Sequence, residues 1–164
     1  MAQTLNSLND LFIWELKDML SAEHQFAAVL PKMIDKASTP ELKEDLSNSL
    51  KETETQTDRL VQIFNLLDVP VAEEWCDGMA GILKEGEQLL FVDGNCAAVD
   101  AGLIGAAQKV EHYEISAYGT LRSFAHSLGR DDVANLLQLS LQEIASTDDV
   151  LTCVAETCVN DRAA

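Results

Sequence analysis

Basic side chains are scarce in this chain of 164 residues. It holds 11 Lys and Arg against 28 Asp and Glu, which gives a formal net charge of -17. Such a surface repels phosphate backbones and anionic lipid headgroups, so we expect neither nucleic acid nor a membrane as a partner. Metal cations are attracted to a surface of this sign, and they are the partners that the charge favours.

Long apolar runs and a basic leader are also missing. The first residues carry acids at Asp10, Glu15 and Asp18, without the basic start or small-residue cleavage site of a secretory signal. No uncharged apolar stretch reaches the length of about 18 residues that spans a bilayer. The four cysteines form no C-x-x-C pair. We therefore expect a cytoplasmic protein with free thiols, the alternative being an extracytoplasmic protein with two disulfides.

Proline and glycine are few, and they fall mostly between long periodic segments. Apolar side chains recur every three or four residues within these segments, which is the period of one helix face. No segment shows the sustained alternation of a strand. Four long helices are predicted at about 5–36, 40–67, 97–128 and 131–159, and a short one at about 79–90.

The residues at the helix ends agree with this division. Thr39 and Pro40 have the types preferred at an N-cap and at the first helical position, and Gly129 is placed to end the third long helix. Short turns make antiparallel neighbours of helices one and two and of helices three and four. The sequence therefore predicts an all-α, single-domain, ferritin-like four-helix bundle over 1–164. It consists of two antiparallel helical hairpins and a long crossover that contains the short helix.

Several glutamates fall on the apolar faces of these helices. Glu23, Glu114 and Glu143 are in step with their apolar stripes, and Glu52 lies on the flank of its own. Glu23 and Glu52 are 29 residues apart, and so are Glu114 and Glu143. Each pair is centred on a predicted turn, so each hairpin is expected to present two inward carboxylates at one level.

Inward carboxylates need compensation. A single Glu at a stripe edge often bends its carboxylate out to solvent, and a partly protonated polar layer is a second alternative. No Lys or Arg is expected near this level on the inward faces, since Arg59 lies about two turns from Glu52. Two divalent ions would balance four carboxylates, and this donor set favours iron or manganese. Glu111, one turn before Glu114, is either a fifth ligand or a solvated residue.

The histidines do not join this pattern. His24 and His112 each follow a Glu directly, which turns them about 100° away from that Glu. His126 lies about three turns from the carboxylates, and the Glu-x-x-His motif of di-iron bundles does not occur. The sequence therefore predicts an all-carboxylate site.

Other polar and aromatic side chains have simpler interpretations. Gln56, Tyr118 and Thr147 each stand four residues after a candidate Glu. They are expected either to hydrogen-bond the ligands or to serve as ordinary polar core residues. Trp14 and Trp75 show no associated chemistry, and burial is the expected role of both.

One stretch of the third predicted helix resembles a known family. Residues 100–121 contain VEHYEI followed by YGTL, and both strings are specific to the YciE/YciF family of ferritin-like proteins. Agreement extends to Ser-Ala-Glu-His-Gln at 21–25 and to Glu-Thr at 52–53, so the resemblance covers nearly the whole chain. It implies a ferritin-like fold, a homodimer and a two-metal carboxylate centre.

The resemblance also implies a function. Some members are linked to stress responses and are described as ferroxidases, so the implied activity is oxidation of Fe(II) by dioxygen or peroxide. Ser49 departs from the family, which often has His there; without that His the site is all-carboxylate and could prefer manganese. A structural or metal-buffering bundle without turnover stays open as the alternative. The implied metal-site residues are Glu23, Glu52, Glu111, Glu114 and Glu143.

Overall fold

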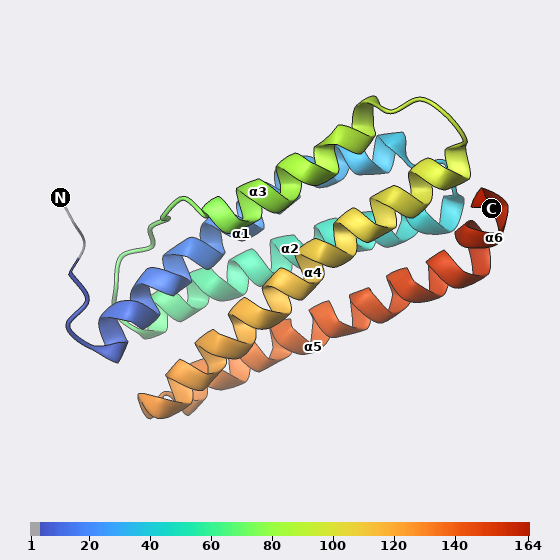
Figure 1. Ribbon diagram of the computed structural model, residues 1–164. Coiled ribbons are helices and arrows are strands. Elements are labelled where there is room, and N and C mark those ends of the chain that lie inside the picture. Colours follow the sequence, from blue (N-terminus) through green and yellow to red (C-terminus); the bar gives the residue numbers. More distant parts are fainter. Residues whose placement is uncertain (1–3) are drawn as a thin grey trace.

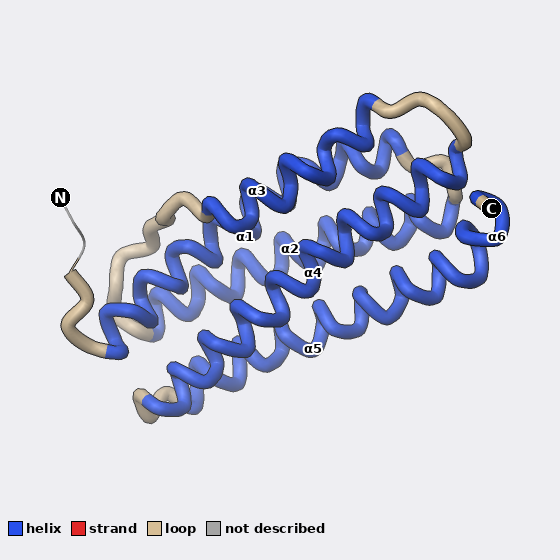
Figure 2. Tube along the Cα trace, viewed as in Figure 1, coloured by secondary structure: helices blue, strands red, loops and turns tan. Residues whose placement is uncertain are grey.

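The computed structural model describes residues 4–164, and no strand forms among them. Helices, one 3-10 turn and one π turn account for most of this length (Figure 2). The elements are α1 (Leu8–Lys36), α2 (Pro40–Leu66), α3 (Asp77–Gly86), η1 (Glu87–Phe91), α4 (Cys96–Ser127), α5 (Asp131–Val154), η2 (Ala155–Val159) and α6 (Asn160–Ala163).

The four long helices form two antiparallel hairpins, α1–α2 and α4–α5, that pack side by side into a bundle (Figure 1). The crossover between α2 and α4 runs back along the outside, where α3 contacts both α1 and α4. The predicted all-α, ferritin-like bundle with a short helix in its crossover is confirmed. Because α3 covers one side of the α1–α4 pair, side chains at that seam are shielded from water.

The helix ends show which local signals decided the boundaries. The first helix begins at Leu8, not near Leu5, because the Ser7 hydroxyl accepts from the Asp10 amide at 3.1 Å and caps it. Thr39 holds the N-cap position of α2 but caps no amide; its hydroxyl donates to Asp100 instead, at 2.6 Å. Gly129 ends the α4 helix with a φ of 71°, the left-handed conformation that glycine adopts without strain.

The core lies between the four long helices and contains large side chains from each of them. Burying it supplies the main driving force for folding, since apolar area is removed from water. Trp75, which we expected to be buried, is 65% exposed on the segment before α3, so that prediction was wrong. No helix in residues 4–164 combines the length and the apolar character needed to cross a bilayer. Core residues include Phe12, Leu16, Phe26, Leu30, Leu46, Leu60, Phe64, Leu103, Leu121, Leu137 and Leu151.

Candidate metal centre

Two glutamates meet in the interior where α1 packs against α4. Glu23 is 0% exposed and Glu114 is 1% exposed. The Tyr118 hydroxyl donates to Glu23 Oε1 at 2.5 Å. The other oxygen of Glu23, Oε2, and Oε1 of Glu114 have no hydrogen-bond partner within the described residues. Each is thus an acceptor atom removed from water and left free to bind a cation or a proton.

Burial and the charges of neighbouring acids raise the pKa of both groups and so favour their protonated forms. Burial raises the pKa of Glu23 to about 8, although the Tyr118 hydrogen bond and the charge of Arg59 oppose the shift. Burial, together with Glu23 and Glu111, raises the pKa of Glu114 well above its ordinary value. The raised pKa values favour the neutral acids in the metal-free protein, so a cation that bound them would displace protons.

Arg59 reaches the carboxylates, contrary to the expectation that no basic side chain would. Its two terminal nitrogens donate to the two oxygens of Glu143 on α5, each at 2.8 Å, and one of them also donates to Ser140 Oγ at 2.7 Å. The arginine side chain is 12% exposed and that of Glu143 is 34% exposed. The guanidinium thus neutralises Glu143 and leaves it at the edge of the interior.

A second group of acids lies further along the bundle. Glu52 accepts from Thr147 Oγ1 at 2.6 Å, so it faces α5 across the α2–α5 contact. Glu111 is 3% exposed, which excludes its interpretation as a solvated residue. Burial and then the charges of Glu23, Glu52, Asp148 and Asp45 raise the pKa of Glu111 to about 9. Glu111 therefore connects the two groups.

The predicted single level of carboxylates is resolved into two neighbouring groups. Glu52 lies opposite Thr147, one helical turn beyond Glu143, whereas Glu143 lies opposite Arg59. Glu52 and Glu143, which belong to different hairpins, are therefore offset from each other along the bundle. The inner group is Glu23, Glu114 and Glu143 with Tyr118 and Arg59; the outer group is Glu52 and Glu111 with Asp45 and Asp148.

Asp45 is an inward acid that the sequence interpretation missed. It is 7% exposed, and its Oδ2 has no hydrogen-bond partner among residues 4–164. The signal was available, since Asp45 lies three residues after Leu42 and four before Ser49, both of which are buried. Asp148 of α5 accepts a hydrogen bond from Gln108 Nε2 at 3.2 Å, at the rim of the outer group.

The donor atoms fit a hard or borderline cation, because they are carboxylate oxygens and three of them are buried without partners. Their present arrangement is not that of a bound ion, however. Within residues 4–164, no three His, Cys, Asp or Glu side chains converge on one point as metal ligands would. Binding would therefore require some carboxylates to turn, including release of Glu143 from Arg59.

The hydrogen bonds expected between neighbouring polar side chains and the candidate ligands are present in part. Tyr118 bonds Glu23 and Thr147 bonds Glu52, in each case across a helix interface and not within one helix. Gln56 is buried, and within residues 4–164 its side chain makes no hydrogen bond to a candidate ligand. His24 pairs with Glu73 and His126 with Asp131 at the surface, and the exposed His112 pairs with Asp148 at the rim of the outer group; no histidine in the described residues pairs with a predicted ligand.

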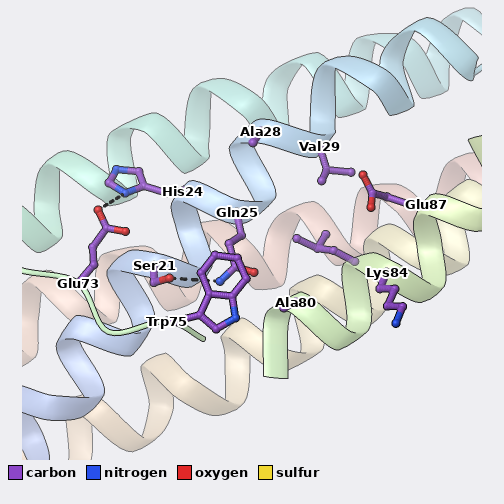
Figure 3. A pocket seen from close by; sticks show the side chains of 11 residues that line it. Ser21, His24, Gln25, Ala28, Val29, Glu73, Trp75, Ala80, Lys84 and Glu87 are labelled. Atoms are coloured by element: carbon purple, nitrogen blue, oxygen red, sulfur yellow. Dashed lines mark hydrogen bonds and ion pairs between the residues drawn. The ribbon is translucent and has the colours of Figure 1, made fainter. Parts of the chain in front are cut away.

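A pocket of about 470 Å³ lies apart from these acids, between α1 and residues 73–87 of the crossover (Figure 3). Trp75, Val29 and Leu83 contribute apolar surface to it, and the His24–Glu73 pair at 2.9 Å stands at one end. None of the predicted metal-site residues lines it. All four cysteines are free thiols, as predicted, and Cys76 is the buried one.

The comparisons with known proteins agree with the fold and with the resemblance. Residues 7–164 match the family described as Domain of unknown function (DUF892). The chain is 36% identical to Protein YciF of Escherichia coli strain K12 over 160 residues, which covers 97% of this chain and 96% of that protein. This chain belongs to the DUF892 family. The expected relation to YciF is thereby confirmed.

Solved structures of related proteins share this fold. The crystal structure of the E. coli stress protein YciF matches with a TM-score of 0.89 and 35% identity, covering 95% of this chain and 99% of that one. YcfI, described as a putative structural protein from Rhodopseudomonas palustris, matches with a TM-score of 0.90 and 35% identity, over 94% and 99%. A protein from Xanthomonas campestris, at 21% identity and a TM-score of 0.77, shares the fold, over 95% and 96%.

Proposed function

We propose that this bundle binds two divalent metal ions among its inward carboxylates and oxidises Fe(II) with dioxygen or peroxide. The observation that carries the proposal is the pair of unpartnered oxygens on Glu23 and Glu114, both fully buried. Burying a carboxyl oxygen without a hydrogen-bond partner is costly, so a protein that retains one on each of these two residues gains from what they bind. Carboxylate oxygen is a donor that Fe(II) and Mn(II) accept.

The residues of the site would have two roles, which are to bind the two metal ions and to release protons when the ions bind. Glu23, Glu114 and Glu143 would hold one ion, and Glu52 and Glu111 would hold the other. Binding expels the protons that Glu23, Glu111 and Glu114 carry in the metal-free protein. Each Fe(II) substrate ion gives up one electron; two electrons and two protons convert dioxygen to hydrogen peroxide, or hydrogen peroxide to two waters. Tyr118 would keep Glu23 oriented through its hydrogen bond.

A proposed role under stress is supported by a relative of this chain. The E. coli relative is described as a stress protein. Removal of Fe(II) together with peroxide would protect a cell under oxidative stress, and this is the role that we propose for the activity.

A second candidate is a structural bundle without turnover, and one observation favours it. Arg59 already neutralises Glu143 with two hydrogen bonds, as a stabilising ion pair would. The description of the R. palustris relative as a putative structural protein points the same way. The two candidates differ in what the unpartnered acids of the inner group do when cations are supplied.

The test is metal analysis followed by oxidation. Untagged protein is analysed for bound metal, stripped with a chelator, loaded anaerobically with Fe(II), and exposed to dioxygen or peroxide while Fe(III) formation is followed. We expect Glu114→Gln to slow oxidation at least about tenfold, the lower end of the effect typical for groups that support a metal site. Glu54→Gln is the matched control, since Glu54 lies exposed on α2. If the wild-type protein neither binds Fe(II) nor speeds its oxidation, the proposed oxidation activity is overturned and the structural bundle is supported.

A further inference from the structure

Asp45 is an unusual residue for the interior of a helix. It lies beyond the first turn of α2, where the helix dipole no longer favours an acid. Aspartate has a low helix propensity, and its burial adds a desolvation cost. No ion pair to Asp45 is present in residues 4–164, and Oδ2 has no hydrogen-bond partner there. Its position is therefore unfavourable for stability.

Asp100 shows how the same protein treats a structural buried aspartate. Asp100 is 0% exposed on α4 and accepts four hydrogen bonds, from the backbone amides and the hydroxyls of Ser38 and Thr39, at 2.6 to 2.9 Å. These bonds tie the α1–α2 turn to the second hairpin. Asp45 has no such set of donors, so it differs from Asp100 in the feature that marks a structural role.

The surroundings of Asp45 are acidic and lack a donor aimed at it. Glu52 lies two turns along the same face of α2, and its charge acts on Asp45; Asp45 in turn acts on Glu111 of α4. Ser49, the polar residue between Asp45 and Glu52, bonds to the backbone carbonyl of Asp45 at 3.2 Å and not to its carboxylate. The free oxygen of Asp45 therefore belongs to the outer group of acids.

We propose that Asp45 is a ligand of the outer metal ion, which it holds together with Glu52 and Glu111. The site takes a hard divalent cation such as Mn(II) or Fe(II), because every donor is an oxygen. Asp148 remains at the rim, since Gln108 and His112 already occupy its oxygens. This inference rests on the proposed function for the presence of metal, and it adds Asp45 as the residue that completes the ligands of the second ion.

The experiment counts Mn(II) ions bound to the full-length metal-free protein, by electron paramagnetic resonance of free Mn(II) during a titration. We expect wild type to bind two ions, Asp45→Asn one and Glu114→Gln one, with the double variant binding none. Asp58→Asn is the matched control, because Asp58 lies exposed on the same helix. Asp45→Ala, which leaves no polar atom to satisfy, replaces Asp45→Asn if that variant does not fold.

The outcomes separate the inference from the proposed function. Loss of one ion on changing Asp45, with two retained in Asp58→Asn, supports Asp45 as a ligand. Two ions of unchanged affinity in a folded Asp45 variant overturn the inference and leave the proposed function standing. Wild type that binds no Mn(II) or Fe(II) overturns the proposed function and the outer site with it.

Discussion

Arg59 of α2 binds both carboxylate oxygens of Glu143 on α5, with N–O distances of 2.8 Å. This pair places a fixed positive charge beside the inner group, where it also lowers the pKa of Glu23 against the larger effect of burial. A metal ion and Arg59 would therefore compete for Glu143. The relation between these two residues connects the stability of the metal-free protein to its affinity for metal.

Replacing Arg59 by Gln should separate these two properties. We expect the free energy of unfolding of the metal-free protein to fall by about 1–3 kcal/mol, because hydrogen bonds to a charged group are lost. Mn(II) affinity should rise, because Glu143 is released and a positive charge leaves the site. Urea unfolding and Mn(II) titration measure the two effects, with Lys51→Gln as an exposed control on α2. A fall in Mn(II) affinity would show that Arg59 instead positions Glu143 for binding.

The metal-free protein should become less stable as pH rises. Glu23 and Glu111 have pKa values raised to about 8 and about 9 by burial, and the pKa of Glu114 is also raised. Above the ordinary value of 4.5 the unfolded chain releases these protons while the folded protein keeps them. The favourable contribution is complete below that value and is lost progressively as pH rises towards 8 and 9.

Urea unfolding in the presence of a chelator measures this dependence. We expect a lower free energy of unfolding at pH 8 than at pH 5.5, and a weaker dependence in Glu114→Gln, which has no proton to lose there. Metal affinity should change in the opposite direction, since protons compete with the ion. Equal stability at the two pH values would mean that these carboxyl groups are hydrated in solution.

Tyr118→Phe removes the hydroxyl that donates to Glu23 at 2.5 Å and keeps the ring. We expect the free energy of unfolding to fall by about 1–2 kcal/mol, because Glu23 is left fully buried without a donor. The pKa of Glu23 should rise further, since this hydrogen bond lowers it. Denaturation and a pH titration of Mn(II) affinity measure the two effects. A change in stability without any shift in the titration would assign Tyr118 to packing alone.

Asp100→Asn should weaken the joint between the two hairpins. Burial raises the pKa of Asp100, but the hydrogen bonds from Ser38 and Thr39 outweigh burial and lower it. We expect a loss of about 2–3 kcal/mol at neutral pH, since charge-assisted hydrogen bonds to the α1–α2 turn are weakened. Metal binding should not change, because Asp100 lies outside both groups of acids.

The free energy of unfolding measured at low pH tests whether the charge of Asp100 causes this loss of stability. A lowered pKa contributes stability that is present above the ordinary value of 3.8 and is lost as pH falls through the folded-state pKa. The difference between wild type and Asp100→Asn should therefore shrink below that value. A difference that stays constant into strong acid would point to lost packing at the turn.

The expectation that no basic side chain reaches the carboxylates was wrong because the Arg59 side chain is long. Arg59 lies about two turns from Glu52, so helix position alone placed it outside the carboxylate layer. Its long flexible side chain nevertheless reaches across to α5, and helical spacing does not show where such a side chain ends. The same spacing did contain Asp45, whose neighbours Leu42 and Ser49 are buried. Asp45 differs from the glutamates in having no mirrored partner at equal distance from the turn, so the mirrored spacing alone did not indicate it.

The sequence by itself determined the helices, their antiparallel pairing and the inward direction of Glu23 and Glu114, whereas only the structure showed that Glu111 is buried. Apolar periodicity, caps and turn residues act within a few residues, so their outcome can be read locally. Tertiary structure alone decided how far each hairpin is displaced along the other. That displacement sets Glu52 opposite Thr147 and Glu143 opposite Arg59, and so divides one predicted layer into two groups. Packing of whole helix faces fixes this offset, and no local signal in either hairpin encodes it.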